Sequence, residues 1–372
     1  MNRRPAWAEV DLAAIASNVA ALRGAAAPAE LCAVVKAGGY GHGAVAVART
    51  AVEAGATWLA VAFTDEGLAL REAGLAVPIL LLSEPAPGEW DDAVHGGLTP
   101  TVYSPQAIAG LADAVAAAGA DPLSVHLKVD TGMHRVGAAP DRAVALCRAV
   151  AARPQLSLGG VWTHCAVADE PEHPFTAIQR QRFDAVLAEL RAAGAPPFVA
   201  HAANSAAAMT QPGLRFDLVR CGIAVYGLDP SPALHGWLPL RPALSLKARV
   251  SHVQVVPAGE AVSYGLRRPV RVASVVATVP LGYADGVPRR LSDVGGEALV
   301  GGRRRPLAGT VTMDQVLLDC GPDADVAVGD EVVLIGEQGD ERIGADDWAR
   351  RLGTINYEIV CGISPRVRRE YR

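Results

Sequence analysis

The stretch LCAVVKAGGYGHGAVAVARTAVEAGATWLAVA, residues 31–62, contains one full repeat of the pattern that organises most of this chain. An apolar, β-branched run ends near Lys36, and a glycine-rich loop follows it. An alanine-rich segment with helical spacing covers Ala44–Ala54, and a second apolar run begins at Trp58. This order predicts a strand, a helix and a second strand parallel to the first.

The same alternation continues from Asp11 to about Leu240. Apolar runs predict eight strands, at Cys32–Lys36, Trp58–Ala62, Pro78–Leu82, Leu98–Val102, Ser124–Asp130, Leu156–His164, Phe198–Ala202 and Leu218–Val225. Helical spacing predicts helices at Ala44–Ala54, Pro105–Ala118, Asp141–Ala152 and Phe175–Ala193. Eight such repeats favour an α/β fold with a closed, TIM-like (β/α)8 barrel over residues 9–240. An open doubly wound sheet is the alternative, but no GxGxxG follows the first strand.

The pattern changes after Leu240. Runs such as LSLKARVSHVQVV (244–256), RVASVVATVP (271–280) and DEVVLIGE (330–337) predict strands joined by Gly, Pro and Asp turns, with one helix near Asp346–Leu352. We therefore expect residues 241–372 to form a second, mostly β domain, with residues 1–8 as candidates to join it. We expect the arginine-rich end, residues 366–372, to be solvated.

Composition narrows the class of protein. The 372 residues are 51% hydrophobic, enough for a large core, and the net charge of -5 without a basic stripe argues against a nucleic-acid partner. No apolar run is long enough to cross a membrane, and MNRRPAWAEVDL lacks the apolar centre of a secretory signal. The six cysteines form no CxxC, which is typical of reduced thiols. These features predict a cytoplasmic protein.

Unusual polar residues follow five of the predicted strands. They are Lys36 and Tyr40, then Lys128, Asp130 and Arg135, then His164 and Asp169, then His201, Asn204 and Ser205, and finally Arg220, Gly222 and Ile223. In a (β/α)8 barrel the chemistry gathers at the C-terminal ends of the strands. The convergence predicts one active site there.

Lys36 ends an apolar run, where desolvation would lower its pKa and free its amine to attack a carbonyl. The alternative is a lysine that reaches out to solvent, but the glycine loop with Tyr40 favours a functional role. After the last two strands, Asn204 and Ser205 open a helix, and Gly222 and Ile223 offer backbone N–H groups that could bind phosphate.

An ordinary helix cap at Asn204 or Ser205 is equally consistent with the sequence. A reactive lysine and a phosphate pocket at one barrel mouth suggest pyridoxal 5'-phosphate, with Arg220 near the ring nitrogen. The alternative for Arg220 is a buried ion pair with Asp217.

Longer motifs carry a resemblance to a known family. The chain resembles alanine racemases, fold-type III pyridoxal-phosphate enzymes, in AVVKAGGYGHG (33–43), HLKVDTGMHRVG (126–137), HAANSA (201–206), VRCGIAVYG (219–227), VSYG (262–265), PLGYADG (280–286), TVTMDQ (310–315) and INYEIVCGISPRVRR (355–369). The likeness covers nearly the whole chain. One departure is Gly38–Gly39, where many members carry a polar or larger residue.

The resemblance implies roles for individual residues. Lys36 would hold the cofactor covalently and act as one base, and Tyr264 would be the opposing base. The cofactor would further contact Arg220 at its ring nitrogen and, around its phosphate, Tyr40, Ser205, Gly222, Ile223 and Tyr357, next to Asn204. His164 would bridge Arg220 and Tyr264. Arg135 and the Met313 backbone would position the substrate carboxylate, and Lys128, as a carbamate, would orient Arg135. The site entrance would be lined by Tyr283, Tyr357 and Asp169.

The resemblance also implies a homodimer with shared active sites, in which Tyr264, Tyr283, Met313 and Asp314 act across the interface. The reaction would supply D-alanine for peptidoglycan. Three alternatives stay open: a racemase for serine or another small amino acid, a fold-type III amino-acid decarboxylase, and a binding protein without catalysis. His164, Cys165, His173 and His201 match no common zinc spacing, so we expect no metal.

Overall fold

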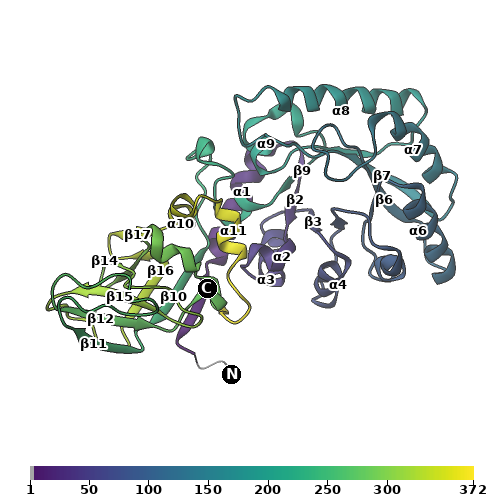
Figure 1. Cartoon of the computed structure of the whole chain (residues 1–372). Helices are drawn as coiled ribbons and strands as arrows, with labels where there is room; N and C mark the ends of the chain where they lie inside the picture. The colour runs from purple at the N-terminus through teal and green to yellow at the C-terminus, as the bar shows by residue number, and fades with distance from the viewer. Residues whose placement is uncertain (1–3) are drawn as a thin grey trace. The chain divides into compact units, whose positions relative to one another are not determined.

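The computed structural model describes residues 4–372, which form two compact units (Figure 1). The barrel unit consists of Ala13–Gly39 and Ala44–Pro242. The β-rich unit consists of residues 4–12, Tyr40–Gly43 and Ala243–Arg372. Of the residues 1–8 considered above, residues 1–3 lie outside the described part of the chain.

Eight parallel strands form the barrel unit: β2 (Glu30–Val34), β3 (Trp58–Val61), β4 (Ile79–Leu81), β5 (Thr101–Val102), β6 (Leu123–Lys128), β7 (Leu156–Trp162), β8 (Val199–His201) and β9 (Leu218–Cys221). They pair in the orders β4-β3-β2-β9 and β5-β6-β7-β8. A parallel bridge between Leu80 and Thr99 joins the two sets on one side. The Asp217 N–H donates to the Ala200 carbonyl on the other, at 3.0 Å. The ring is closed, so the predicted (β/α)8 barrel is confirmed.

Helices alternate with these strands as predicted. They are α1 (Leu12–Ala26), α2 (Lys36–Tyr40), α3 (Ala44–Glu53), α4 (Thr64–Glu72), α5 (Trp90–His95), α6 (Pro105–Ala118), α7 (Ala143–Ala151), α8 (Phe175–Ala192) and α9 (Ser205–Thr210), with 3-10 turns η1 (Pro87–Glu89), η2 (Pro140–Arg142), η3 (Pro212–Leu214), η4 (Ile223–Tyr226) and η5 (Pro232–Leu234). In α6, the Ser104 side chain caps the N-terminus and Gly119 closes the C-terminus in the left-handed region. Across the described residues, no helix has the length and apolarity needed to cross a bilayer.

The β-rich unit contains the strands β1 (Ala6–Val10), β10 (Leu244–Arg249), β11 (His252–Val256), β12 (Ser274–Val279), β13 (Glu297–Val300), β14 (Arg303–Pro306), β15 (Val316–Gly321), β16 (Glu331–Gln338), β17 (Glu341–Ile343) and β18 (Arg368–Tyr371). Its helical elements are η6 (Tyr283–Asp285), η7 (Arg289–Val294), α10 (Ala345–Leu352) and α11 (Asn356–Cys361). The helix expected near Asp346–Leu352 is present, and α11 is an addition.

Strand β1 lies inside this unit, antiparallel to β10 and parallel to β18. The expectation that the arginine-rich end is simply solvated was therefore wrong. Arg369 is half-buried and donates to the carbonyls of Ile363, Ser364 and Val367, and its Nε donates to the Gly41 carbonyl at 2.9 Å. These are four backbone carbonyls, three of them near the end of the chain, and one arginine side chain supplies their donors.

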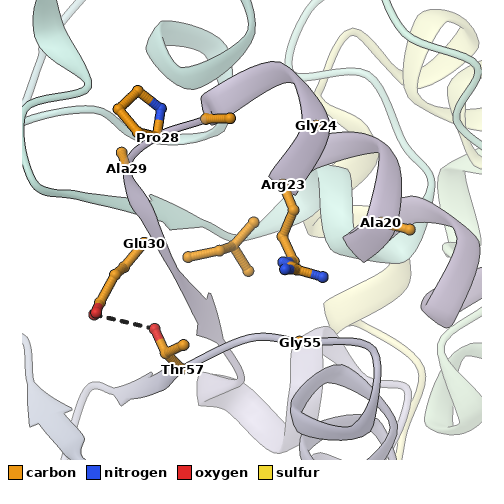
Figure 2. Close-up of a pocket in the computed structure, with 10 residues that line it drawn as sticks. Ala20, Arg23, Gly24, Pro28, Ala29, Glu30, Gly55 and Thr57 are labelled. Atoms are coloured by element: carbon orange, nitrogen blue, oxygen red, sulfur yellow. Dashed lines mark hydrogen bonds between the residues drawn. The ribbon is translucent and has the colours of Figure 1, made fainter.

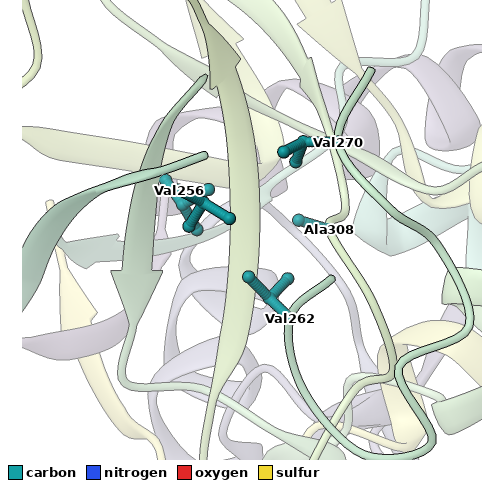
Figure 3. Close-up of a cluster of buried hydrophobic side chains, with 5 residues drawn as sticks. Val256, Val262, Val270 and Ala308 are labelled. Carbon is teal, nitrogen blue, oxygen red and sulfur yellow. The ribbon is translucent and has the colours of Figure 1, made fainter. Parts of the chain in front are cut away.

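A small apolar cluster lies beside the three-stranded sheet β11-β12-β15 (Figure 3). Its buried members are Val256, Val262, Val270, Val276 and Ala308. Val262 comes two residues before Tyr264, so burial of its side chain anchors the loop that carries the tyrosine.

Candidate active site

Lys36 stands at the C-terminal end of the first barrel strand, in an unusual backbone turn. Strand β2 ends at Val34, two residues earlier than predicted, and Lys36 is half-buried. The next residues are left-handed: φ is 53° at Ala37, 61° at Gly38 and 64° at Gly39. The Gly39 N–H donates to the Val35 carbonyl at 2.9 Å, which closes the turn. Glycine makes two of these positions free of strain, which explains the Gly38–Gly39 pair.

Arg220, in β9, is buried and held from several directions. One Nη donates to His201 Nδ1 at 2.8 Å; the other donates to the carbonyls of Thr163 (2.8 Å) and Ala202 (3.0 Å) and contacts His164 Nδ1 at 3.3 Å. The side chain is therefore rigid, and burial lowers its pKa to about 10.

The alternative of an Arg220–Asp217 ion pair was wrong. The Asp217 carboxylate instead accepts the Ala200 N–H at 2.7 Å, and within residues 4–372 no carboxylate pairs with Arg220. A buried arginine without a carboxylate keeps its donors available to a neutral acceptor.

His201 and His126 extend this network into the barrel core. Because a guanidinium only donates, His201 Nδ1 accepts from Arg220, and its Nε2–H then donates to His126 Nδ1 at 2.9 Å. His126 is fully buried, and its Nε2 is without a partner among the described residues. Burial, then the charge of Arg220, lowers the pKa of His126 to about 3, so the ring is neutral.

Lys128, at the end of β6, is a second buried lysine. Its Nζ lies 4.2 Å from the centre of the Trp162 ring, and the Arg220 guanidinium lies 4.5 Å from the same ring. Burial, then the charges of Arg220 and Arg135, lowers the pKa of Lys128 to about 7. A large part of this amine is therefore neutral at physiological pH.

Four basic side chains act on His164. Burial and the charges of Arg220, Lys128, Arg135 and Lys36, in that order, lower the pKa of His164 well below its ordinary value. The imidazole is neutral, and since its Nδ1 faces Arg220, its proton lies on Nε2. The charges of Arg220, Arg135 and Lys36 near one imidazole suit an anionic ligand.

The loops after β8 and β9 are joined directly. Ser205 is buried, and its Oγ accepts the Gly222 N–H at 2.9 Å, which leaves the hydroxyl proton available to a ligand. The Asn204 side chain accepts the Ala207 N–H at 3.0 Å and therefore acts as a helix cap. Ile223 begins η4 beside them. Asp169 is half-buried, and its carbonyl accepts from the Ser231 hydroxyl.

In the β-rich unit, hydrogen bonds hold the backbone around Tyr264, whereas its side chain is exposed to solvent. Its carbonyl accepts from the Thr310 hydroxyl at 2.9 Å, and the Ser263 hydroxyl donates to the Thr310 carbonyl at 2.6 Å. The Tyr264 side chain is nevertheless 73% exposed. The residue is presented on the surface of its unit.

Tyr283, Met313 and Asp314 lie on a neighbouring pair of loops. The Tyr283 N–H donates to the Thr312 carbonyl at 2.9 Å. Arg366 bridges buried Asp285 (3.4 Å) and exposed Asp314 (2.7 Å), and so ties the two loops together. Tyr283 and Met313 are exposed, like Tyr264.

Tyr40 and Tyr357 also belong to this unit, and their ring centres lie 6.2 Å apart. Tyr40 is buried, which raises the pKa of its phenol, so it is a hydrogen-bond donor at neutral pH. The site residues thus form two groups, one in each unit.

Family models match both units. The model for the alanine racemase N-terminal domain matches residues 10–230, and the model for the alanine racemase C-terminal domain matches residues 243–371. The chain belongs to the alanine racemase family. An alanine racemase of Symbiobacterium thermophilum is 48% identical over 371 residues, which is 99% of this chain and 97% of that protein.

Solved alanine racemases share the fold. The enzyme from the D-cycloserine producer Streptomyces lavendulae superposes with a TM-score of 0.94 at 42% identity, over 100% of this chain and 98% of that one. A histidine racemase from Leuconostoc mesenteroides subsp. sake is also similar, with a TM-score of 0.91 and 30% identity over 100% of this chain and 99% of that one. One architecture therefore serves more than one amino-acid substrate.

A hollow of about 500 Å³ opens elsewhere on the barrel unit (Figure 2). It is lined by the end of α1 and the start of β2, and Glu30 there accepts from the Thr57 hydroxyl at 3.1 Å. This is the N-terminal side of the strands, opposite the end that carries chemistry in such barrels. None of the predicted site residues lines it.

Proposed function

We propose that this protein interconverts L-alanine and D-alanine with pyridoxal 5'-phosphate as cofactor. The observation that carries the proposal is the buried Arg220, which has no carboxylate partner among the described residues and shares a cationic cluster with Lys36. An arginine cannot accept a proton, so it would leave a pyridine nitrogen unprotonated. That favours a simple proton transfer over decarboxylation, which benefits from a stronger electron sink.

The side chains fit this cofactor. Its aldehyde needs an amine, which Lys36 supplies, and its ring nitrogen needs a polar partner, for which Arg220 is held rigidly. Its phosphate needs donors, for which we propose Ser205, Gly222, Ile223, Tyr40 and Tyr357 with Asn204 beside them. The Gly222 N–H, which donates to Ser205 Oγ at 2.9 Å, would then be shared with the phosphate. When bound, the cofactor acidifies the Cα–H of an attached amino acid by spreading charge over its ring.

The remaining chemistry belongs to the protein. A racemase removes a proton from one face of a planar carbon and returns one to the other, so we propose that Lys36 Nζ and Tyr264 Oη serve opposite faces. His164 links Arg220 to Tyr264 in this scheme. Arg135 and the Met313 backbone orient the substrate carboxylate. Tyr283, Tyr357 and Asp169 line the entrance.

We propose a carbamate on Lys128. The lowered pKa of this amine, about 7, supports it, because only a neutral amine reacts with carbon dioxide. A carbamate would replace a buried cation by an anion beside Arg135 and Arg220, which removes a like-charge repulsion.

We also propose a cytoplasmic homodimer in which Tyr264, Tyr283, Met313 and Asp314 of one subunit serve the active site of the other, and a role in supplying D-alanine for peptidoglycan. Support comes from the exposure of the Tyr264, Tyr283 and Met313 side chains on the single chain. Exposed apolar side chains on ordered loops are typical of interfaces.

Borohydride fixation tests the cofactor assignment. The chain has three lysines, Lys36, Lys128 and Lys247, so mass mapping is unambiguous. We expect the reduced cofactor on the Lys36 peptide alone, and a label on either of the other two would contradict the assignment. Lys36→Ala should lower racemase activity by at least about 10⁴-fold.

Substrate and reaction type are tested in deuterated water with L-alanine, L-serine and L-histidine in parallel. We expect exchange of the Cα proton and formation of D-alanine without carbon dioxide. The similarity to a histidine racemase makes another amino acid the second candidate, and faster exchange of serine or histidine would establish it. Released carbon dioxide would indicate a decarboxylase, and absence of any exchange a binding protein.

A further inference from the structure

The turn that follows Lys36 has little stability of its own. Ala37 adopts φ 53° and ψ 49°, a conformation that L-residues other than glycine rarely hold. Gly38 and Gly39 follow, and neither has a side chain with which to brace the turn. Within the turn, the Gly39 N–H to Val35 carbonyl bond bypasses Ala37, so the Ala37 peptide depends on a contact from outside the turn.

Glu66 makes the necessary contacts. Its Oε1 accepts the Ala37 N–H at 2.6 Å, and its Oε2 accepts the N–H groups of Ala62 and Phe63 at 2.9 and 3.3 Å. Glu66 is the third residue of α4, and the bond from Phe63 is an ordinary capping contact at the start of that helix. The bond from Ala37 is different, because it crosses from the end of β3 to the end of β2.

We propose, on the basis of the role given above to Lys36, that Glu66 is a positioning residue that aims the Lys36 amine. Its carboxylate clamps the C-terminal ends of two adjacent barrel strands and fixes the peptide that begins at Lys36. Bonds from N–H groups to an ionised carboxylate are stronger than those to neutral acceptors. The clamp is therefore suited to hold a backbone conformation that the Ala-Gly-Gly sequence does not favour.

The clamp matters because covalent attachment requires the amine to meet a bound aldehyde at a defined distance and angle. A displacement of about 1 Å can slow such a step by about 100-fold. Loss of the Ala37 bond would release the turn into the many conformations open to glycine, and Lys36 would spend only part of its time correctly placed.

Glu66→Asp separates clamping from helix capping. Aspartate keeps the negative charge at the start of α4 but is one methylene too short to reach Ala37. The matched controls are Glu72→Gln, an exposed glutamate at the end of the same helix, and Ser104→Ala, which removes the cap of α6 without touching this turn.

The readout is the rate at which pyridoxal 5'-phosphate attaches to Lys36 after the cofactor has been removed, followed by borohydride quenching and peptide mass. We expect Glu66→Asp to slow attachment about tenfold. Glu72→Gln should attach the cofactor at the wild-type rate, and any slowing in Ser104→Ala should be explained by its lower melting temperature. Wild-type attachment in Glu66→Asp, or slowing no greater than in an equally destabilised Ser104→Ala, would overturn the role of Glu66.

If the wild-type protein shows no label on Lys36, the proposed function itself fails, and the clamp loses its purpose with it. A label on Lys36 that forms equally fast in both proteins rejects the clamp alone. The two failures are therefore distinguishable in one experiment.

Discussion

Lys36 and Tyr264, the two proposed bases, have contrasting surroundings. Lys36 is half-buried in a turn clamped by Glu66, near the rigid Arg220 and the neutral His164. Tyr264 has an equally well-fixed backbone, but the residue is 73% exposed on the single chain. The contrast teaches that the barrel unit contains its own electrostatic environment, whereas the tyrosine needs one from elsewhere. In the homodimer proposed above, a second copy of the chain would supply it.

The contrast between Lys36 and Tyr264 is tested most strongly by removing the hydroxyl of Tyr264, the exposed residue of the two. Tyr264→Phe deletes one proton-carrying atom and leaves the backbone contacts to Thr310 in place. We expect activity to fall by about 10² to 10⁴-fold, with exchange of the Cα proton from one enantiomer reduced more than from the other. The measurement is deuterium exchange into L-alanine and D-alanine separately.

Thermal unfolding of Tyr264→Phe serves as the control, since an exposed substitution should change the free energy of unfolding by no more than about 0.5 kcal/mol. If exchange from both enantiomers falls only slightly and equally, Tyr264 is not a base in this reaction, and its contrast with Lys36 has no catalytic meaning.

The next largest effect concerns Lys128, the buried lysine of the barrel unit, and the pH dependence of the free energy of unfolding. Burial first, then Arg220 and Arg135, lowers the pKa of Lys128 to about 7 in the folded state, against about 10.4 in the unfolded chain. Between these values the unfolded state binds more protons, so the free energy of unfolding rises with pH from about 7 to about 10. Each pKa unit corresponds to about 1.4 kcal/mol.

Lys128→Met should remove this rise. We expect the difference in free energy of unfolding, wild type minus variant, to increase with pH across that window in bicarbonate-free buffer, as measured by urea titration. A difference that stays flat would place the amine in contact with solvent. If the carbamate forms, added bicarbonate should raise the free energy of unfolding of the wild type and leave that of Lys128→Met unchanged.

The smallest effect concerns the turn itself. At Gly38 an added side chain meets nothing within 4 Å, whereas at Gly39 a Cβ would lie 3.1 Å from the Ala44 backbone. Both positions are left-handed, which asparagine tolerates better than alanine. We expect Gly38→Ala to lower the free energy of unfolding by about 1 kcal/mol because of its left-handed backbone, and Gly39→Ala to lower it further because its Cβ would also crowd the Ala44 backbone.

Melting temperatures of the two glycine variants provide the measurement, and each variant is the control for the other. Equal losses at both positions would mean that backbone conformation alone, and not the closeness of Ala44, decides the cost.

The sequence predicted what depends on periodicity. Alternating apolar and helical runs located all eight barrel strands, because buried parallel strands are apolar throughout. Polar residues directly after those runs identified Lys36, Lys128, His164 and Arg220 as neighbours, since parallel strands end at one edge. The order of the strands around the barrel then brought their charges together, as the lowered pKa of His164 shows.

What the sequence could not predict depends on single contacts. Nothing in the sequence distinguishes Glu66 from other glutamates near the start of a helix, and only the contact of its Oε1 with the Ala37 N–H sets it apart. His126 follows an apolar pattern that fits a satisfied histidine equally well. The one available signal was the Gly38–Gly39 pair, which indicated an unusual turn but not what holds it.

The position of β18 has a consequence for the order of folding. Strand β1 pairs in parallel with β18, and the Arg368 side chain reaches the Arg4 carbonyl across 364 positions of sequence. Arg369, from the same strand, holds the Gly41 carbonyl, and the Tyr371 hydroxyl occupies the space beside Gly43. Contacts of such long range close a very large loop, which costs conformational entropy. The Gly41–Gly43 segment, only a few positions beyond Lys36, cannot make these contacts before the last strand is in place, and a chain from which that strand has come away would leave the segment without them.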